Sequence, residues 1–327
     1  MQMANLAARS PQITEAEILA ARGAKNRVDP RRPYAFLSER ERTADGNVED
    51  VATIFLTNRE CPWRCLMCDL WRNTTDDTTP PGAAPEQIDY ALTRLPPARH
   101  IKLYNSGNFF DAKAIPPGEH RAIAECVRRF RTVIVENHPK LCGEACLRFR
   151  DLVETRLEIA LGLETVHPDV LPRLNKDMTP DDFSRAVEFL LRREIAVRAF
   201  VLLRPPFLSE AEGVEWAAKS VEFACSLGVG CMSIIPTRGG NGIMEQLARA
   251  GQFTPPKIES LEAALAQGLE LARSRAGAAP RVFVDLWDAE KFCRCNECGP
   301  ARVARLAEMN LTQQLSPSIV CEACGSR

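Results

Sequence analysis

Short apolar runs alternate along the middle of the chain with longer segments in which apolar residues recur every three or four positions. Short apolar runs bounded by loop residues are typical of buried strands, whereas the longer periodic segments are typical of amphipathic helices. Strands are predicted at 53–58, 100–105, 132–137, 156–164, 195–203 and 229–236. Helices are predicted at about 85–95, 117–130, 143–152, 179–194 and 209–228.

The predicted strands are nearly continuously apolar, which is typical of a parallel sheet covered by helices on both faces. Thr179 and Pro180 suit the cap and first turn of the helix that they open. Strand–helix units at 53–236 suit an incomplete barrel better than a full eightfold one. The predicted fold class is therefore α/β, a partial (β/α)6 barrel.

Further segments flank this predicted barrel. The expected division is a helical N-terminal extension at 1–48, the barrel at 49–256, and a small C-terminal appendage at 257–327. The appendage contains a predicted helix (258–276), a predicted strand (281–287) and a cysteine-rich tail.

Polar residues follow the predicted strands where a parallel barrel carries its chemistry, at the carboxyl ends. We expect these residues to share one rim of the barrel. They are Cys61, Cys65 and Cys68 after the first strand, Ser106, Gly107 and Asn108 after the second, Glu136, Asn137 and His138 at the third, and Glu164 at the fourth.

Overall composition says little about the class of protein, whereas the cysteines are informative. Lys and Arg (42) nearly balance Asp and Glu (43), so net charge favours no particular partner. No apolar run is long enough to span a membrane, and the first residues lack the apolar stretch of a secretory signal, so we expect a cytoplasmic protein without membrane contact. Clustering of many of the 13 cysteines then indicates metal ligation rather than disulfides.

The first cysteine group has the spacing C-x3-C-x2-C at Cys61, Cys65 and Cys68. Thiolates suit zinc, copper(I) or an iron–sulfur cluster. A [4Fe–4S] cluster needs four ligands, so three cysteines leave one iron open to another molecule. The alternatives are three core cysteines or part of a zinc site.

The tail carries two C-x2-C pairs, which suit a tetrahedral zinc site made of Cys295, Cys298, Cys321 and Cys324. Cys293 is then surplus, or it replaces one of the four. An auxiliary iron–sulfur cluster and unligated thiols are the alternatives. The other cysteines are expected to be core or partly buried thiols, with Cys142 and Cys146 near the rim: Cys126, Cys142, Cys146, Cys225 and Cys231.

The first cysteine loop, placed directly after a first barrel strand, resembles that of the radical S-adenosylmethionine superfamily. The resemblance implies that a [4Fe–4S] cluster chelates S-adenosylmethionine at its open iron and reduces it to methionine and a 5′-deoxyadenosyl radical. Met67 stands where many members have an aromatic residue. The implied ligands of S-adenosylmethionine are Ser106, Gly107 and Asn108 for the amino group, Glu164 for the ribose, and Asn175 and Lys176 for the carboxylate.

Longer segments resemble the radical S-adenosylmethionine subunit of archaeosine synthase, which shares a core with the Elongator catalytic subunit and the methylthiotransferases. These segments are YNSGNFFD, GLETVHPDVLPRLNKDMTPDDF, VLLRPPFLSEAEGVEWA and CNECGPARVARLAEMNLTQ. The resemblance implies radical C–N bond cleavage of a lysine-adducted 7-deazaguanine in tRNA, a transglycosylase-like partner subunit, and an electron donor such as flavodoxin or ferredoxin.

Two other functions fit the sequence. One is a radical enzyme acting on a small metabolite or peptide, and the other is a zinc-dependent structural or nucleic-acid-binding protein. Basic residues before the barrel can follow an RNA backbone, but acidic residues are interspersed with them, so a solvated surface fits equally well. These basic residues are Arg22, Lys25, Arg27, Arg31, Arg32, Arg40 and Arg42.

Overall fold

The computed structural model describes residues 12–275 and 279–325. Over these residues an eight-stranded sheet has its strands in chain order. β1 pairs with β2 antiparallel, and every later pair of neighbours is parallel. The strands are β1 (Ala35–Arg42), β2 (Val48–Phe55), β3 (His100–Tyr104), β4 (Thr132–Asn137), β5 (Arg156–Glu164), β6 (Ala196–Leu203), β7 (Cys231–Pro236) and β8 (Arg281–Val284).

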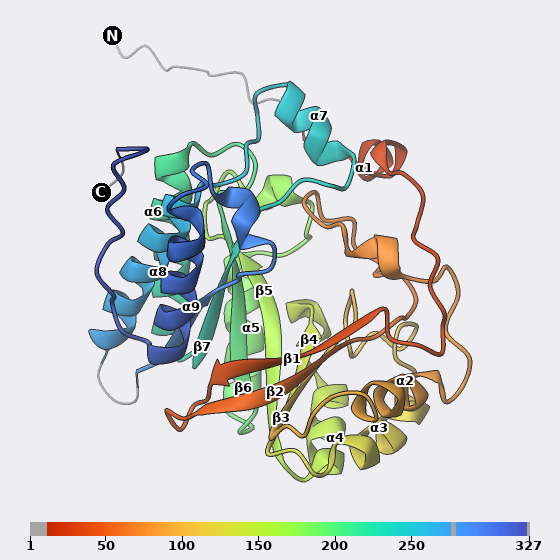
Figure 1. Cartoon of the computed structure of the whole chain (residues 1–327). Helices are drawn as coiled ribbons and strands as arrows, with labels where there is room; N and C mark the ends of the chain where they lie inside the picture. The colour runs from red at the N-terminus through yellow and green to blue at the C-terminus, as the bar shows by residue number, and fades with distance from the viewer. Residues whose placement is uncertain (1–11, 276–278, 326–327) are drawn as a thin grey trace.

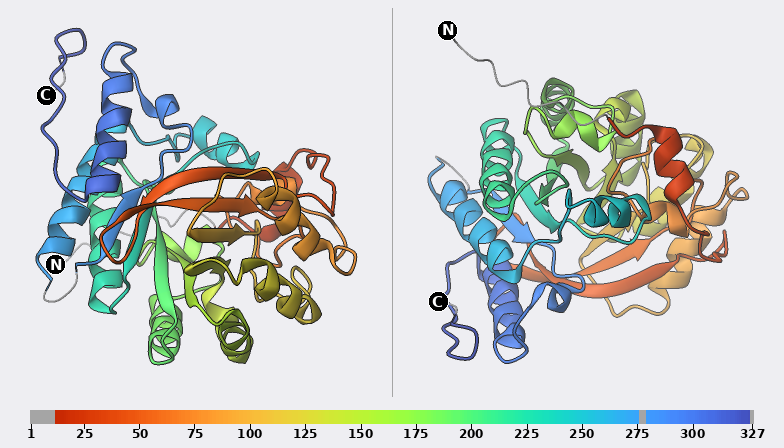
Figure 2. Two further views of the ribbon diagram at one scale, coloured as in Figure 1. Left: turned by 60° about the horizontal axis from the view of Figure 1, so that its bottom comes forward. Right: turned by 90° about the horizontal axis from the view of Figure 1, so that it is seen from above.

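The sheet curls into an incomplete barrel with helices on its outer face (Figure 2). Figure 1 shows α2, α3 and α4 grouped at one end of this layer and α6, α8 and α9 at the other. The α-helices are α1 (Glu15–Ala21), α2 (Ala83–Leu92), α3 (His120–Val127), α4 (Glu144–Val153), α5 (Pro180–Leu191), α6 (Glu210–Ser226), α7 (Ile243–Arg249), α8 (Ile258–Arg273) and α9 (Gly299–Thr312). None of the described helices is both long and apolar enough to cross a membrane.

Local sequence explains where the helices begin. Thr179 caps α5 as predicted, and its side chain and that of Asp182 bond reciprocally to each other's backbone N–H. Ser209 and Glu212 form the same capping box at α6. The predicted α/β class and partial barrel are confirmed, because the six predicted strands correspond to β2–β7.

The structure differs from the sequence prediction at both ends of the sheet. Within the described part of the N-terminal extension, residues 12–48, only Glu15–Ala21 is α-helical, and Ala35–Arg42 is a strand paired with β2. Its charge-rich sequence, AFLSERER, does not look like a buried strand. It forms one because Glu41 pairs with the buried Arg198 inside the barrel. The segment expected as a strand of the appendage, 281–287, contributes β8, which extends the barrel sheet beside β7.

Ion pairs connect the two ends of the sheet inside the barrel. Arg198, 2% exposed, bonds to Glu41 of β1 at 2.6 Å and to Glu158 of β5 at 2.7 Å. Arg281 of β8 reaches Glu158 at 3.1 Å, and Lys102 of β3 reaches Glu41 at 2.6 Å. Charges therefore join β1 and β8, which do not pair as strands.

A second apolar cluster covers the first cysteine loop. It brings together α1, α7 and the side chain of Leu66, which lies between the cysteines and is fully buried. Met67 packs against this cluster from the same loop. The buried members are Ile18, Leu66, Val170, Leu174, Leu202, Leu208, Ile243, Met244, Leu247 and Phe253.

Candidate cluster site and C-terminal metal site

The first cysteine loop is fixed by backbone contacts with distant segments. Asn241, just before α7, donates its side-chain amide to the carbonyls of Leu66 (2.8 Å) and Cys68 (3.1 Å). The Leu66 N–H donates to the Leu174 carbonyl at 2.8 Å. Asn175 donates to the Arg64 carbonyl at 2.8 Å. The loop conformation is therefore held from outside, independently of any bound group.

Basic residues of the N-terminal segment also hold this loop. Glu60, directly before Cys61, pairs with Arg22 at 2.7 Å and with Lys25 at 2.8 Å. Arg31 and Arg32 pair with Glu86 of α2. Much of the basic segment considered as an RNA contact is thus engaged in ion pairs within the chain.

The loop after β3 contacts the first cysteine. The Asn108 side-chain amide donates to Cys61 Sγ at 3.2 Å, and Gly107 lies against Cys61, where an added Cβ would stand 3.6 Å from the Cys61 Cβ. Ser106 adopts a left-handed conformation, with φ of 51°, and its hydroxyl bonds to the Tyr34 hydroxyl at 2.9 Å. The predicted residues Ser106, Gly107 and Asn108 therefore border the cysteine loop.

Glu136, near the end of β4, holds the backbone of the loop after β3 by hydrogen bonds. Its Oε1 accepts hydrogen bonds from the backbone N–H of Asn105 (2.5 Å) and Gly107 (3.5 Å). Burial raises the pKa of Glu136 to about 7, although these backbone bonds act in the opposite direction. Glu136 therefore sets the path of the segment that carries Asn108.

Glu164 and Lys176 form a buried ion pair of 2.6 Å. The β5–β6 register shifts between Gly162 and Glu164, and Glu164 has φ of 62°, so a bulge directs this carboxylate. A Cβ on Gly162 would overlap the Glu164 carboxylate and stand 2.5 Å from Lys176 Nζ. Only glycine leaves room for the pair at this position.

The pKa values of the Cys61, Cys65 and Cys68 thiols are all raised by burial. Burial raises the pKa of Cys65 to about 12, with the Lys176 charge lowering it and the Glu164 charge raising it. Burial also raises the pKa of Cys61 and Cys68. Metal binding would displace these protons and place negative charge beside the Lys176 ammonium. Three thiols, an amide donor and a buried cation suit an iron–sulfur cluster.

His138 is a neutral structural group at this rim. Burial lowers its pKa to about 3, and its ring stacks on Trp63 of the cysteine loop with centroids 3.9 Å apart. The Lys140 N–H donates to Nδ1 at 3.2 Å, so the neutral ring carries its proton on Nε2 and donates it to the Lys176 carbonyl at 3.1 Å. His138 thereby links Trp63 to Lys176.

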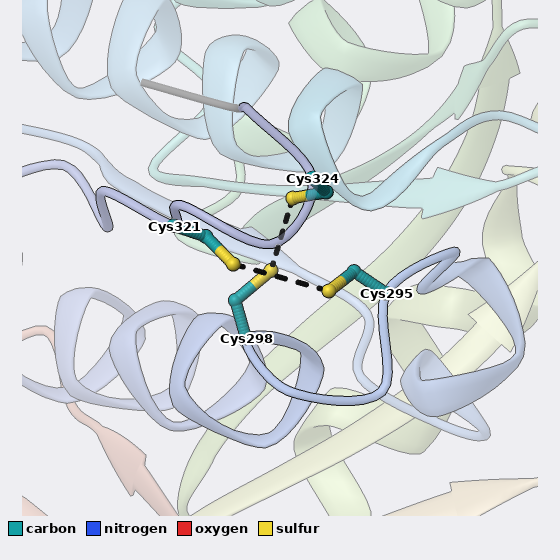
Figure 3. A group of neighbouring side chains, drawn as sticks. All are labelled: Cys295, Cys298, Cys321 and Cys324. Carbon is teal, nitrogen blue, oxygen red and sulfur yellow. Dashed lines mark hydrogen bonds between the residues drawn. The ribbon is translucent and has the colours of Figure 1, made fainter.

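The C-terminal cysteines form a separate group. Figure 3 shows the sulfur atoms of Cys295 and Cys298, before α9, pointing toward those of Cys321 and Cys324 in the tail. All four sulfur atoms lie within 4.8 Å of one another, with 3.9 Å between Cys295 and Cys321 and 3.8 Å between Cys298 and Cys324. This group could hold a metal ion.

Cys293 lies outside that group. Its Sγ lies 3.8 Å from the carbonyl oxygens of Ala289 and Gly299. Of the other thiols, Cys146, Cys225 and Cys231 are buried, while Cys126 and Cys142 are half-buried. Cys142 accepts a 3.7 Å contact from the Asn137 amide near the rim.

Sequence reasoning missed several residues of the site. Asn241 gave no signal, because a single Asn in a loop is common in any protein. Gly162 sits inside a predicted strand, and an isolated strand glycine does indicate a bulge or close approach. Local sequence does not indicate the bond of Tyr34 to Ser106, because this bond depends on the unpredicted strand β1.

No family model matches the chain. An uncharacterised protein of Methanocaldococcus jannaschii is 23% identical over 90% of this chain and 85% of its own length. Archaeosine synthase subunit beta of Methanosarcina acetivorans is 27% identical over 70% of this chain and 68% of that protein. Among solved structures, archaeal Elp3 of Methanocaldococcus infernus with an N-terminal deletion has a similar fold.

The Elp3 superposition has a TM-score of 0.50 at 13% identity and covers 70% of this chain and 59% of that one. At this identity the likeness concerns the fold alone. The match to archaeosine synthase subunit beta spans most of both chains. The relatives confirm the resemblance to the archaeosine synthase subunit that was predicted from the motifs, and the Elp3 likeness agrees with the fold that this resemblance implies.

Proposed function

We propose that this chain is an enzyme that binds a [4Fe–4S] cluster through Cys61, Cys65 and Cys68 and cleaves S-adenosylmethionine reductively. When bound, the cluster supplies the electron that splits S-adenosylmethionine into methionine and a 5′-deoxyadenosyl radical. The observation that carries the proposal is the convergence of these cysteines with Asn108, Glu164 and Lys176 at one rim. Such convergence of thiols with a buried ion pair exceeds what packing requires.

In this proposal each of these contacts has a stated role. Asn108 donates to Cys61 Sγ and orients that ligand. The Ser106–Asn108 backbone receives the amino group of S-adenosylmethionine. Glu164 and Lys176, which lie 2.6 Å apart in the ion pair, receive the ribose and the carboxylate.

The direct test is anaerobic reconstitution with iron and sulfide, followed by dithionite and S-adenosylmethionine. We expect a brown protein that forms 5′-deoxyadenosine without any other substrate. A colourless protein that binds zinc at the first cysteine loop, retains no iron and forms no 5′-deoxyadenosine would favour the zinc-dependent structural or nucleic-acid-binding alternative.

Gly162→Ala offers a sharper test of the ion pair. The new Cβ would overlap Glu164 and crowd Lys176, so the pair must move. We expect the KM for S-adenosylmethionine in the uncoupled reaction to rise about tenfold, the equivalent of about 1.4 kcal/mol, and stability to fall by about 1–3 kcal/mol.

Gly230→Ala is the matched control, since nothing lies within 4 Å of a Cβ at that position. This variant should keep the wild-type KM. A Gly162→Ala protein with a wild-type KM would separate the Glu164–Lys176 pair from S-adenosylmethionine binding.

For the substrate, we propose a tRNA nucleoside, because a relative matched over 70% of this chain is named archaeosine synthase subunit beta, as is a second relative matched over 37% of it. The reaction would be radical C–N cleavage of a lysine-adducted 7-deazaguanine, with a transglycosylase-like partner and a flavodoxin or ferredoxin as electron donor. Nucleoside mass spectrometry of tRNA from a deletion strain and its parent tests this. An unchanged nucleoside profile would favour a small metabolite or peptide instead.

We further propose zinc at the C-terminal group. Thiolates at the corners of a tetrahedron, each ~2.3 Å from zinc, lie about 3.8 Å apart, as do the measured pairs. Ligands of a cubane lie on separate irons and are therefore spread more widely. Arg302, whose Nε contacts Cys298 Sγ at 3.4 Å, offsets part of the thiolate charge.

Cys298→Ala should release the zinc, because three ligands remain and one of the closest pairs is lost. We expect the zinc content to drop, the tail to become protease-sensitive and the thermal midpoint to fall by several degrees. Elemental analysis, limited proteolysis and thermal denaturation measure these effects.

Cys293→Ala is the control, since Cys293 lies in the same segment but outside the four-cysteine group. It should retain stoichiometric zinc. Iron in place of zinc at this group, with a second cluster signal lost in Cys298→Ala, would support the auxiliary cluster instead.

A further inference from the structure

A connected group of aromatic side chains lies inside the barrel, toward the carboxyl ends of the strands. Phe55, the last residue of β2, is at its centre, with ring centroids 5.6 Å from Tyr34, 6.1 Å from Tyr104 and 6.4 Å from Trp287. Phe200 of β6 extends the group, 6.0 Å from Tyr104. Because side chains alternate along a strand, Tyr104 and Phe200 share the interior face with Lys102 and Arg198. The group therefore faces the concave side of the sheet.

These rings are not closed off by the protein. Tyr34, Phe55, Tyr104 and Phe200 are each partly exposed, and Trp287 is 58% exposed. Trp287 follows β8, whose residues are all buried. A tryptophan is the most costly side chain to leave in water at such a position. Its exposure beside other rings indicates a surface that receives a ligand.

The aromatic group adjoins the proposed cluster site. The Tyr34 hydroxyl bonds to Ser106 at 2.9 Å, and Ser106 lies two residues before Asn108, which contacts Cys61 Sγ. Phe55 ends the strand that leads into the cysteine loop. Phe55 ends β2 and Trp287 follows β8, so their contact spans the gap between the first strands of the sheet and the last. A molecule on these rings would lie at the mouth where the radical forms.

Polar groups beside Trp287 can form hydrogen bonds with the edge of a base that is stacked on the indole. Arg238 pairs with Asp285 at 2.9 Å and also donates to the Trp287 carbonyl. The backbone N–H of Trp287 donates to Asp285 Oδ1 at 3.0 Å, which keeps this carboxylate near residue 287. The side chain of Arg238 is 28% exposed and that of Asp285 is 32% exposed, so a ligand can reach both groups. A donor and an acceptor therefore flank the exposed ring.

We propose that the exposed Trp287 ring, which Phe55 contacts at an interplanar angle of 67°, is an aromatic platform on which a purine-like base of the molecule to be modified stacks, with Asp285 and Arg238 at its edge. The inference rests on the proposed function and names the residues that would hold its substrate base. Stacking on aromatic side chains and hydrogen bonding at the base edge are the usual means of holding an unpaired base. The adenine of S-adenosylmethionine has the same chemistry, and the experiment must separate the two.

The probe for a substrate base is guanosine 5′-monophosphate, measured by calorimetry on the anaerobically reconstituted full chain, with ribose 5-phosphate as the probe that lacks a base. Trp287→Ala should weaken guanosine 5′-monophosphate binding about tenfold, within the range for one base–aromatic stack. Ribose 5-phosphate should bind equally to both proteins. Wild-type affinity for guanosine 5′-monophosphate in Trp287→Ala would overturn the platform.

Two variants control for indirect effects. Trp287→Phe keeps a stacking ring and should retain affinity near that of the wild type. Leu315→Ala removes another exposed apolar side chain, 40% exposed in the tail, and should change nothing. Equal loss of affinity in Trp287→Ala and Leu315→Ala would overturn the proposal, because it would mark a general effect of surface truncation.

The KM for S-adenosylmethionine in uncoupled cleavage separates the two purines. It should be unchanged in Trp287→Ala if the platform serves the substrate. A tenfold rise would assign the platform to adenine and overturn the substrate role. If the wild-type chain fails to cleave S-adenosylmethionine at all, the proposed function fails, whereas the comparison of guanosine 5′-monophosphate with ribose 5-phosphate still tests the platform.

Discussion

Cys65→Ala is expected to abolish formation of 5′-deoxyadenosine from S-adenosylmethionine. The proposed cluster has only three protein ligands, and loss of one leaves two irons without a thiolate. The loop itself should keep its shape, since Leu66, Asn241 and Asn175 hold it through contacts that do not involve the Cys65 side chain. Chromatographic assay of 5′-deoxyadenosine, with iron and sulfide analysis, measures the outcome.

Cys126→Ala is the matched control. Cys126 is a half-buried thiol on α3 whose Sγ lies 4.0 Å from the Pro85 carbonyl, away from the loop. This variant should retain iron and activity. Undiminished cleavage in Cys65→Ala would refute the cluster assignment, whereas equal loss in both variants would point to a general sensitivity to cysteine removal.

Arg198→Met should destabilise the protein by about 3–5 kcal/mol, the usual cost of removing one partner from a buried ion pair. Arg198 binds Glu41 and Glu158 at once, so its loss leaves two buried carboxylates short of a partner. Lys102 and Arg281 still reach these carboxylates and limit the damage. Urea denaturation at pH 7 measures the difference.

The same variant should change how stability depends on pH. The charges of Arg198 and its neighbours hold the pKa of Glu41 and Glu158 below the ordinary carboxylate value, against the opposing effect of burial. A depressed folded-state pKa gives stability that is present above the unfolded pKa of about 4.3 and lost as pH falls through the folded pKa. Arg198→Met should therefore lose less stability on acidification than the wild type.

Arg192→Met provides the comparison, because Arg192 pairs with Glu188 on the exposed surface of α5 and its side chain is 73% exposed. Surface pairs of this kind contribute about 0–1 kcal/mol. An Arg198→Met protein as stable as Arg192→Met would mean that the interior ion pairs contribute little to holding β1 and β8 together.

The sequence by itself determined the core of the barrel and the position of its chemistry. Strands β2–β7 could be predicted because both faces of these strands are covered within the fold, which requires nearly continuous apolar runs in the sequence. The order of elements then put Cys61, Ser106 and Glu164 at one rim, because parallel strands share the direction of their carboxyl ends. Spacing between cysteines was enough to indicate two separate thiol groups.

Tertiary structure alone decided how distant segments complete each site. β1 could not be predicted, because the charge of Glu41 is balanced by Arg198 and Arg281, which lie far away in the sequence. The same holds for three contacts between segments that are distant in the sequence. They are the grouping of the four C-terminal cysteines, the contact of Asn241 with the cysteine loop, and the contact of Phe55 with Trp287. Local periodicity records which face of an element is buried, but side-chain contacts across the barrel depend on its curvature and register, which only the folded chain fixes.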